Sequence, residues 1–203
     1  VYDKKVQTSN VRYGDSFKTI WYANSEGTFI EEEIPDLYVF AVATARDGDI
    51  VQNAYESTGG FAGYQTVENF HEKALQAARR AVELLSAPPV TGGKYTVITN
   101  PEITGVFTHE AFGHLSESDF VYENERMKEL MQLGKRFGAG NLNIIDDGSL
   151  QDGLGTHRYD QEGVPMRKNY LIKDGFLVGR LHSRETAAKM GEPLTGNART
   201  VAF

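Results

Sequence analysis

Two histidines five positions apart constrain the local fold of this chain more than any other feature. They are His109 and His114, and Glu110 directly follows the first of them. Paired imidazoles beside a carboxylate are the minimum set of side chains for a site that binds a metal and activates water. In the familiar zinc peptidases the spacing is four positions, which places both rings on one face of a helix. A spacing of five leaves the rings roughly 140° apart around a regular α-helix, too far for one shared ion.

A helix that carries this motif must therefore be locally distorted. A single-turn π-bulge accommodates one extra residue, and such bulges concentrate at functional sites. Gly113 stands directly before the second histidine and lowers the steric cost of the distortion. The sequence thus favours a hydrolytic metal site, and the alternative is that both histidines are ordinary polar residues at a helix end.

The residues before the motif predict where the helix begins and which side of it is buried. Asn100 suits the N-cap, Pro101 suits the first helical position, and Glu102 lies at the positive end of the helix dipole. Four apolar residues at helical spacing predict a face that packs against the protein: Ile103, Val106, Phe107 and Ala111.

The amino-terminal half of the chain predicts strands followed by a helix. Turn residues separate the strands of two expected hairpins, 17–23 with 28–33 and 37–46 with 49–56. Apolar residues at helical spacing predict a helix over 67–85, and Pro88 and Pro89 end it. A strand is expected over 94–99, before the motif helix.

Beyond the motif the pattern becomes more irregular. A further helix is expected over 120–133, and a polar loop over 148–163. A hairpin is expected at Asp174–Gly175, and a short helix over 184–190. Together these elements predict an α+β fold, in which an antiparallel β-sheet packs with a few helices and the metal motif lies on a locally distorted helix.

Composition excludes several classes of partner. The formal net charge of −7 argues against a nucleic-acid-binding surface, which requires a basic excess. No apolar run approaches the roughly 20 residues that span a bilayer, so no membrane association is expected. The absence of cysteine removes any disulfide framework and fits a cytoplasmic location.

The run from His109 to His114, followed by Glu117 and Asp119, resembles the signature of the TldD/PmbA family of metallopeptidases. Other segments agree with the family in the same order along the chain: Asn24–Gly27, Gly59–Tyr64, Asp146–Gly148, Glu162–Pro165, Asp174–Gly179 and Pro193–Arg199. The resemblance extends over essentially all 203 residues.

This resemblance implies roles for the motif residues and an activity for the protein. His109 and His114 are the expected metal ligands, and Glu110 is the expected general base. Family subunits with this motif are the active members and their partner subunits lack it, so the chain resembles an active TldD-type subunit. It is expected to hydrolyse unfolded peptides or short polypeptides in the cytoplasm, as a homodimer or as a heterodimer with a related subunit. Zinc is the expected metal, with iron, cobalt and nickel as alternatives.

The resemblance also implies a third metal ligand, typically a cysteine, from a later part of the polypeptide. Because the chain has no cysteine, we interpret it as the central fragment of a longer protein, with an incomplete metal site and no activity of its own. Residues 1–90 are expected to be the end of an amino-terminal α+β region. Residues 91–203 are expected to be the start of the metallopeptidase catalytic region, truncated before its end.

Some residues within the chain are chemically able to complete the site instead: Glu117, Asp119, Glu123, His157 and His182. Glu117 and Asp119 also suit a role as carboxylates that orient the imidazoles, and the alternative is that they are solvated acids. His157 and His182 are expected to be exposed polar residues.

Two other functions fit the same sequence. One is a non-catalytic scaffold, assembly or regulatory subunit of the same fold, since some family members carry the label of modulators of DNA gyrase. The other is a metal-dependent amidase that acts on small molecules. Neither alternative requires direct contact with nucleic acid, against which the net charge argues.

Overall fold

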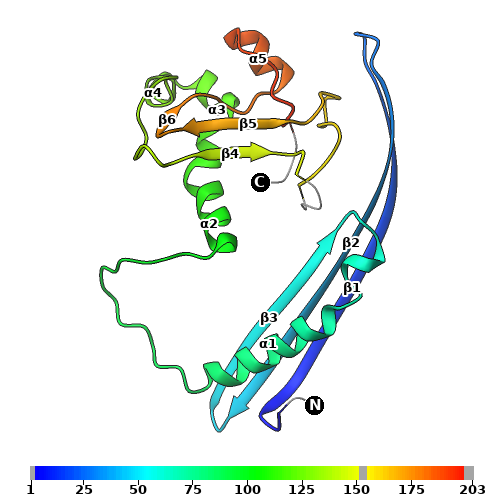
Figure 1. The fold of residues 1–203 in the computed structure, drawn as a ribbon, viewed down its shortest axis with the longest axis vertical. Helices are drawn as coiled ribbons and strands as arrows, with labels where there is room; N and C mark the ends of the chain where they lie inside the picture. Colours follow the sequence, from blue (N-terminus) through cyan, green and yellow to red (C-terminus); the bar gives the residue numbers. More distant parts are fainter. Residues whose placement is uncertain (1–2, 151–154, 199–203) are drawn as a thin grey trace. The chain divides into compact units, whose positions relative to one another are not determined.

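The structure is a computed structural model that describes residues 3–150 and 155–198 (Figure 1). Its architecture is α+β, with two small antiparallel sheets and a few helices, which confirms the predicted class. The predicted loop over 148–163 includes residues 151–154, which lie outside the described residues. Within the described ranges, no helix has both the length and the apolar content needed to cross a bilayer.

The chain forms two compact units, and one hairpin contributes to both. The first unit comprises the chain up to Trp21 together with Ile30–Tyr95. The second comprises Tyr22–Phe29 together with the chain from Thr96 onward. The tip of the first hairpin therefore belongs to the second unit, whereas the rest of that hairpin belongs to the first.

The first unit contains a three-stranded sheet in which the strands follow one another in chain order. Its strands are β1 (Val6–Ala23), β2 (Phe29–Asp47) and β3 (Ile50–Gly60). Both predicted hairpins are present, and β2 is shared between them, so that they form one sheet. The second hairpin turns at Gly48, whose φ of +59° lies in the left-handed region that glycine tolerates. Pro35 lies in the part of β2 that β3 does not reach, because β3 pairs with β2 only from Leu37 onward.

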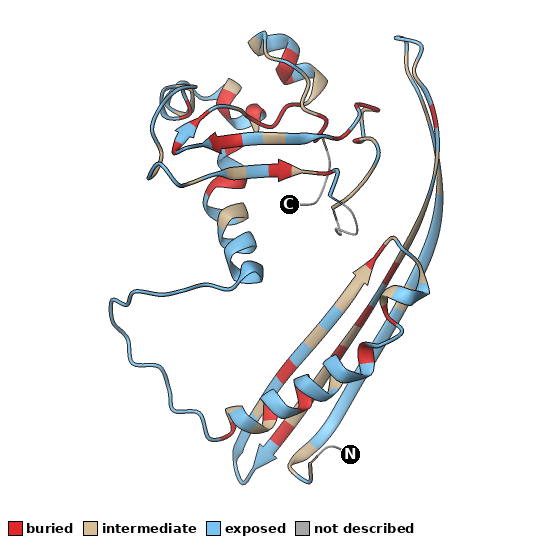
Figure 2. Cartoon of the chain, viewed as in Figure 1, coloured by how far each residue is buried: buried red, intermediate tan, exposed pale blue. Residues whose placement is uncertain are grey.

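The predicted helix is α1 (Phe70–Leu84), which follows a short 3₁₀ turn, η1 (Tyr64–Thr66). Small buried side chains pack α1 against the sheet: Ala78 and Ala81 belong to the same cluster as Ala43, Ala45 and Ala54. Alanine on both surfaces lets the helix and the strands approach closely. Figure 2 shows buried positions recurring along α1 and β2 with exposed positions between them, as expected for elements that bury one face.

The second unit has its own three-stranded sheet, in the order β4-β5-β6, and most of the helices. Its elements are α2 (Pro101–Thr108), α3 (Ser118–Glu123), α4 (Glu125–Leu130), β4 (Ile144–Asp147), β5 (Lys168–Lys173), β6 (Phe176–Leu177) and α5 (Arg184–Met190). The buried core consists of Phe112, Val121, Met131, Leu171, Ile172, Leu177 and Leu181. The hairpin predicted at Asp174–Gly175 and the helix predicted over 184–190 are both confirmed.

Two predicted elements of the second unit are wrong in detail. Residues 94–99 form no strand, and the side chains of Val97 and Ile98 are exposed by 71% and 101%. A strand needs a hydrogen-bonded neighbour, and the described residues supply none to this segment. The helix predicted over 120–133 is divided at Asn124, whose side chain accepts hydrogen bonds from the backbone N–H groups of Arg126 and Met127 and so begins α4.

The apolar face predicted for the motif helix is also wrong. Ile103, Val106 and Phe107 are exposed by 55%, 57% and 68%, and Ala111 is exposed as well. No element within the described ranges covers these apolar side chains. A cavity of about 570 Å³ lies between α2 and β4. The residues of the motif that are buried are Phe112 and Gly113.

The hairpin tip is fixed within the second unit by contacts to a later loop. Nη1 of Arg184 donates a hydrogen bond to Oε2 of Glu26 at 2.6 Å, and the backbone N–H of Arg184 donates to Oε2 of Glu162 at 2.6 Å. A side chain at Gly163 would collide with the ring of Tyr22, and the φ of Gly163 is +71°. The segments Asn24–Gly27 and Glu162–Pro165, which the sequence analysis singled out separately, therefore lie together.

Candidate metal centre

The helix that carries the paired histidines begins and distorts as the sequence predicts. The side chain of Asn100 accepts a hydrogen bond from the N–H of Ile103 at 2.9 Å, and Pro101 occupies the first turn. The α-helix then passes into a π-helix over His109–Gly113 and into a 3₁₀ turn over His114–Ser116. The predicted π-bulge is therefore present at the motif.

The π-helix brings the two imidazoles to the same side. The backbone N–H of His114 donates to the carbonyl oxygen of His109, which is the i to i+5 hydrogen bond that defines a π-helix. The ring centroids lie 4.5 Å apart with an interplanar angle of 76°. Gly113 has helical angles, φ −51° and ψ −55°, which any residue can adopt.

Glu110 lies between the two rings. Its Oε1 is 3.9 Å from Nε2 of His109, and its Oε2 is 4.0 Å from Nε2 of His114. One ligand atom from each of the three residues lies within 4.8 Å of the other two. The side chain of Glu110 is 66% exposed, so its carboxylate is open to water and to reactants.

These side chains fit a divalent transition metal. Two nitrogens bound to one zinc ion at about 2.1 Å are at most about 4.2 Å apart, and the ligand atoms of this cluster lie within 4.8 Å of one another. Nδ1 of His114 lies 2.7 Å from Oε1 of Glu117, where it donates a hydrogen bond to the carboxylate. Nε2 of His114 then carries the lone pair that a metal requires.

The other sequence-predicted residues lie in different surroundings. Asp119 is exposed in the first turn of α3, and its predicted role beside the imidazoles stays a prediction. Glu123 is exposed on the same helix, and His157 is half-buried. The prediction that His182 is exposed is wrong, because its residue is only 3% exposed. Its burial had no local signal, since its partners include Ser118, 64 positions earlier, and Glu192, ten positions later.

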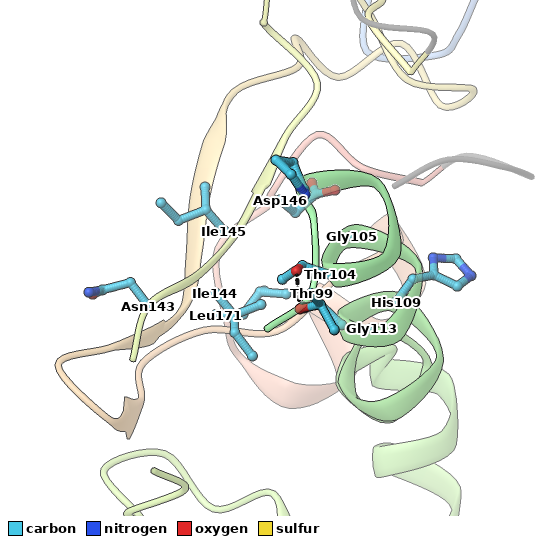
Figure 3. Close-up of a pocket in the computed structure, with 12 residues that line it drawn as sticks. Thr99, Thr104, Gly105, His109, Gly113, Asn143, Ile144, Ile145, Asp146 and Leu171 are labelled. Carbon is cyan, nitrogen blue, oxygen red and sulfur yellow. Dashed lines mark hydrogen bonds between the residues drawn. The ribbon is translucent and has the colours of Figure 1, made fainter. Parts of the chain in front are cut away.

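Two cavities lie near the motif. The cavity of about 570 Å³ between α2 and β4 is lined by Thr104, Asp146 and the backbone side of His109, whose ring points away from the β4 residues (Figure 3). A second cavity, of about 510 Å³, has the following lining residues: His114, Leu115, Phe120, Glu123, Asn124 and Met127. Only the second cavity therefore lies on the imidazole side of the motif helix.

Comparison with known protein families gives two matches in chain order. A family model described as the PmbA/TldA metallopeptidase central domain matches residues 1–85. A second, described as the PmbA/TldA metallopeptidase C-terminal domain, matches residues 92–203.

Individual relatives align over nearly the whole chain. A metalloprotease of Synechocystis sp. is 49% identical over 199 residues, which cover 98% of this chain and 43% of that protein. A protein of Saccharolobus solfataricus named zinc metalloprotease TldD homolog is 30% identical over 200 residues, which cover 98% of this chain and 44% of that protein. The chain spans less than half the length of these relatives.

Solved structures share the fold. A candidate modulator of DNA gyrase from Thermotoga maritima superimposes with a TM-score of 0.84 at 25% identity, over 98% of this chain and 45% of that one. TldE from Thermococcus kodakarensis superimposes with a TM-score of 0.68 at 22% identity, over 94% of this chain and 42% of that one. The second likeness shows the fold alone. Because two family models match consecutive parts of the chain and close relatives align along it, the chain belongs to the TldD/PmbA family of metallopeptidases.

Proposed function

We propose that this chain acts as an active TldD-type subunit of a metal-dependent peptidase. The observation that carries the proposal is the π-helix, which gathers His109, Glu110 and His114 within 4.8 Å although their spacing would separate them on a regular helix. The names of the relatives, which include metalloproteases and a zinc metalloprotease, support the same activity.

In this proposal His109 and His114 hold the metal and Glu110 is the general base. A divalent cation, when bound, polarises the scissile carbonyl and lowers the pKa of the attacking water. The exposed Glu110 carboxylate accepts the proton from that water and passes it to the leaving amine. Glu117 orients the His114 ring through the hydrogen bond at Nδ1.

We propose zinc as the metal and a third ligand from outside these 203 residues. Catalytic zinc sites have three protein ligands, and the chain places two imidazoles at the cluster. The name of the Saccharolobus solfataricus relative supports zinc. Iron, cobalt and nickel accept similar donors and stay as alternatives.

The proposed substrates are unfolded peptides or short polypeptides. An extended peptide is recognised mainly through backbone hydrogen bonds along a sheet edge, which gives weak sequence preference. The sheet of the second unit has β4 at one edge. The cavity of about 510 Å³ beside His114 has the apolar side chains of Leu115 and Phe120 in its lining and suits one substrate side chain.

The proposed assembly is a homodimer, or a heterodimer with a related subunit. We keep the division into residues 1–90 and 91–203 as a proposal, supported by the break between the two matched family models. The cytoplasmic location also stays a prediction.

Metal analysis of the full-length protein tests the site. Purified without chelator, the parent protein is expected to hold about one equivalent of divalent metal, and a His109→Ala, His114→Ala double variant none. His71→Ala is the matched control, because His71 is an exposed histidine on α1 with 69% of its side chain accessible. Equal metal in the parent and the double variant, or metal in neither, would favour the scaffold or regulatory subunit.

Peptide turnover tests the mechanism. Glu110→Gln is expected to lower cleavage of an unfolded polypeptide by about 10²- to 10⁴-fold while metal content stays unchanged. Unchanged turnover contradicts the role of Glu110. A parent protein that cleaves small amides and spares polypeptides is instead the metal-dependent amidase.

A further inference from the structure

The backbone around Glu117 is fixed on both sides by one residue of a distant segment. The N–H of Leu181 donates to the carbonyl oxygen of Ser116 at 2.9 Å, and the N–H of Ser118 donates to the carbonyl oxygen of Leu181 at 2.9 Å. Glu117 and Leu181 therefore form an isolated parallel bridge. Ser116 and Ser118 are fully buried, so the two hydrogen bonds are shielded from water.

The residues on either side of Leu181 are in turn held by a single carboxylate. Nη1 of Arg180 donates to Oε1 of Glu192, and Nε2 of His182 lies 3.0 Å from Oε2 of the same residue. Arg180 and His182 are only 6% and 3% exposed. Glu192 thus contacts the residues on both sides of Leu181, and the backbone of Leu181 in turn bonds the residues on both sides of Glu117.

Glu192 is placed for this role by the end of α5. The helix ends at Gly191 in the left-handed conformation, with φ 67°, and the backbone N–H of Glu192 donates to the carbonyl oxygen of Ala187 at 3.0 Å. This is the usual geometry of a helix C-terminus. The side chain of Glu192 is 20% exposed, so both its oxygens are directed to buried donors from a position near the surface.

A buried ionic cluster of this kind is not the most stable way to fill a core. Apolar residues of similar volume are often equally or more stabilising, whereas removal of one charged partner is strongly destabilising. Nη2 of Arg180 donates to the carbonyl oxygen of Met131 at 2.7 Å, and Nε has no hydrogen-bond partner among the described residues. The guanidinium therefore depends on Glu192 for its charge balance, which points to a role in fixing one conformation.

We propose that Glu192 is a positioning residue of the metal centre, which acts through Arg180, His182 and Leu181 to fix Glu117 against Nδ1 of His114. Each step of this route is a polar contact in the structure. Glu192 contacts residues 180 and 182, the backbone of Leu181 bonds residues 116 and 118, and Glu117 contacts His114. The inference rests on the proposed function, because the last residue of the route, His114, is a metal ligand only in that proposal.

Zinc affinity of the full-length protein, measured by competition with a chromophoric chelator, tests the proposal. Loss of a residue that orients a metal ligand typically weakens binding by 10- to 100-fold, so Glu192→Ala is expected to weaken zinc binding about tenfold. Glu192→Gln keeps an acceptor for Arg180 and is expected to weaken binding less. Glu185→Ala removes an exposed carboxylate of the same helix and is the control expected to leave affinity unchanged.

A double-mutant cycle separates positioning from a general effect on the fold. If Glu192 acts through Glu117, the Glu117→Ala, Glu192→Ala variant binds zinc within about twofold of Glu117→Ala alone. Independent, additive losses would overturn the proposal. Unchanged affinity in both Glu192 variants would overturn it as well.

Nuclear magnetic resonance of metal-free protein with ¹⁵N-labelled histidine provides a readout that needs no metal. At a pH where the imidazoles are neutral, His114 of the parent is expected in the Nδ1–H form, and Glu192→Gln is expected to mix in the other tautomer. An unchanged His114 tautomer would overturn the route even if Glu192→Ala fails to fold. Failure of the proposed function gives a different result: the parent protein and the His109→Ala, His114→Ala variant would then bind zinc with the same affinity.

Discussion

Nδ1 of His114 and Oε1 of Glu117 lie 2.7 Å apart, at the junction between the 3₁₀ turn and α3. A carboxylate at this nitrogen selects the tautomer of the ring in which the other nitrogen, Nε2, carries the lone pair. The three-residue separation places the pair in one short segment, so the ring orientation depends directly on how Glu117 is held.

The first prediction concerns the two carboxylates after the motif. Glu117→Gln is expected to weaken zinc binding about tenfold, because an amide holds the imidazole less strongly than a carboxylate. Asp119→Asn is expected to have a smaller effect, since Asp119 is exposed in the first turn of α3. Chelator competition measures both, and an equal loss in the two variants would contradict this ranking.

The second prediction concerns the cavity beside His114. Phe120 lines it and is 57% exposed, so Phe120→Asp is expected to place a charge where a substrate side chain packs. KM for peptides with large apolar residues is expected to rise about tenfold with kcat nearly unchanged, the pattern of lost binding common to ground and transition states. Val178→Asp, at another exposed apolar position, is the control. A fall in kcat at unchanged KM would argue against a binding role.

The third prediction concerns pH. The side chain of Lys189 hydrogen-bonds Glu185, and this bond, followed by the charge of Lys189, holds the pKa of Glu185 below its usual 4.5. A lowered carboxylate pKa stabilises the fold above the unfolded-state pKa, and the contribution is lost as pH falls through the lowered value. In Lys189→Ala the pKa of Glu185 is expected to return toward 4.5. A pH titration followed by the ¹³C chemical shift of the Glu185 carboxylate measures its pKa in both proteins. An unchanged pKa would show that the Glu185–Lys189 pair does not persist in solution.

The fourth prediction concerns the start of α5. The Ser183 side chain accepts a hydrogen bond from the N–H of Thr186, and the Thr186 side chain accepts one from the backbone N–H of Ser183. Ser183→Ala is expected to lower the free energy of unfolding by about 1 kcal/mol. Urea denaturation measures the loss, with Ser25→Ala in an exposed turn as control. Equal stability of both variants would show that the cap adds nothing.

Features with a local cause were predictable from the sequence. The cap at Asn100, the turn at Asp174–Gly175 and the bounds of α5 follow from residues that contact their own neighbours. The π-helix was predictable for a different reason. A regular helix would separate His109 and His114, so the hypothesis that they share one metal ion required a distorted backbone at this point.

Features that depend on a distant partner were not predictable. The period of Ile103, Val106 and Phe107 identifies one side of a helix, but it cannot say which element covers that side. The prediction of a strand over 94–99 was wrong for a similar reason, because one segment does not encode which other strand it pairs with. His182 gave no signal, because its partners in the buried interior include Ser118, 64 positions earlier, and Glu192, ten positions later.

The hairpin tip at Tyr22–Phe29 has a consequence for how the protein can be divided. The polypeptide passes from one unit to the other more than once, so no single cut yields both units whole. A fragment that begins at Thr96 would lack Glu26, which pairs with Arg184, and Tyr22, which lies against Gly163. A cut between α1 and α2 would therefore separate the second unit from its own segment Tyr22–Phe29.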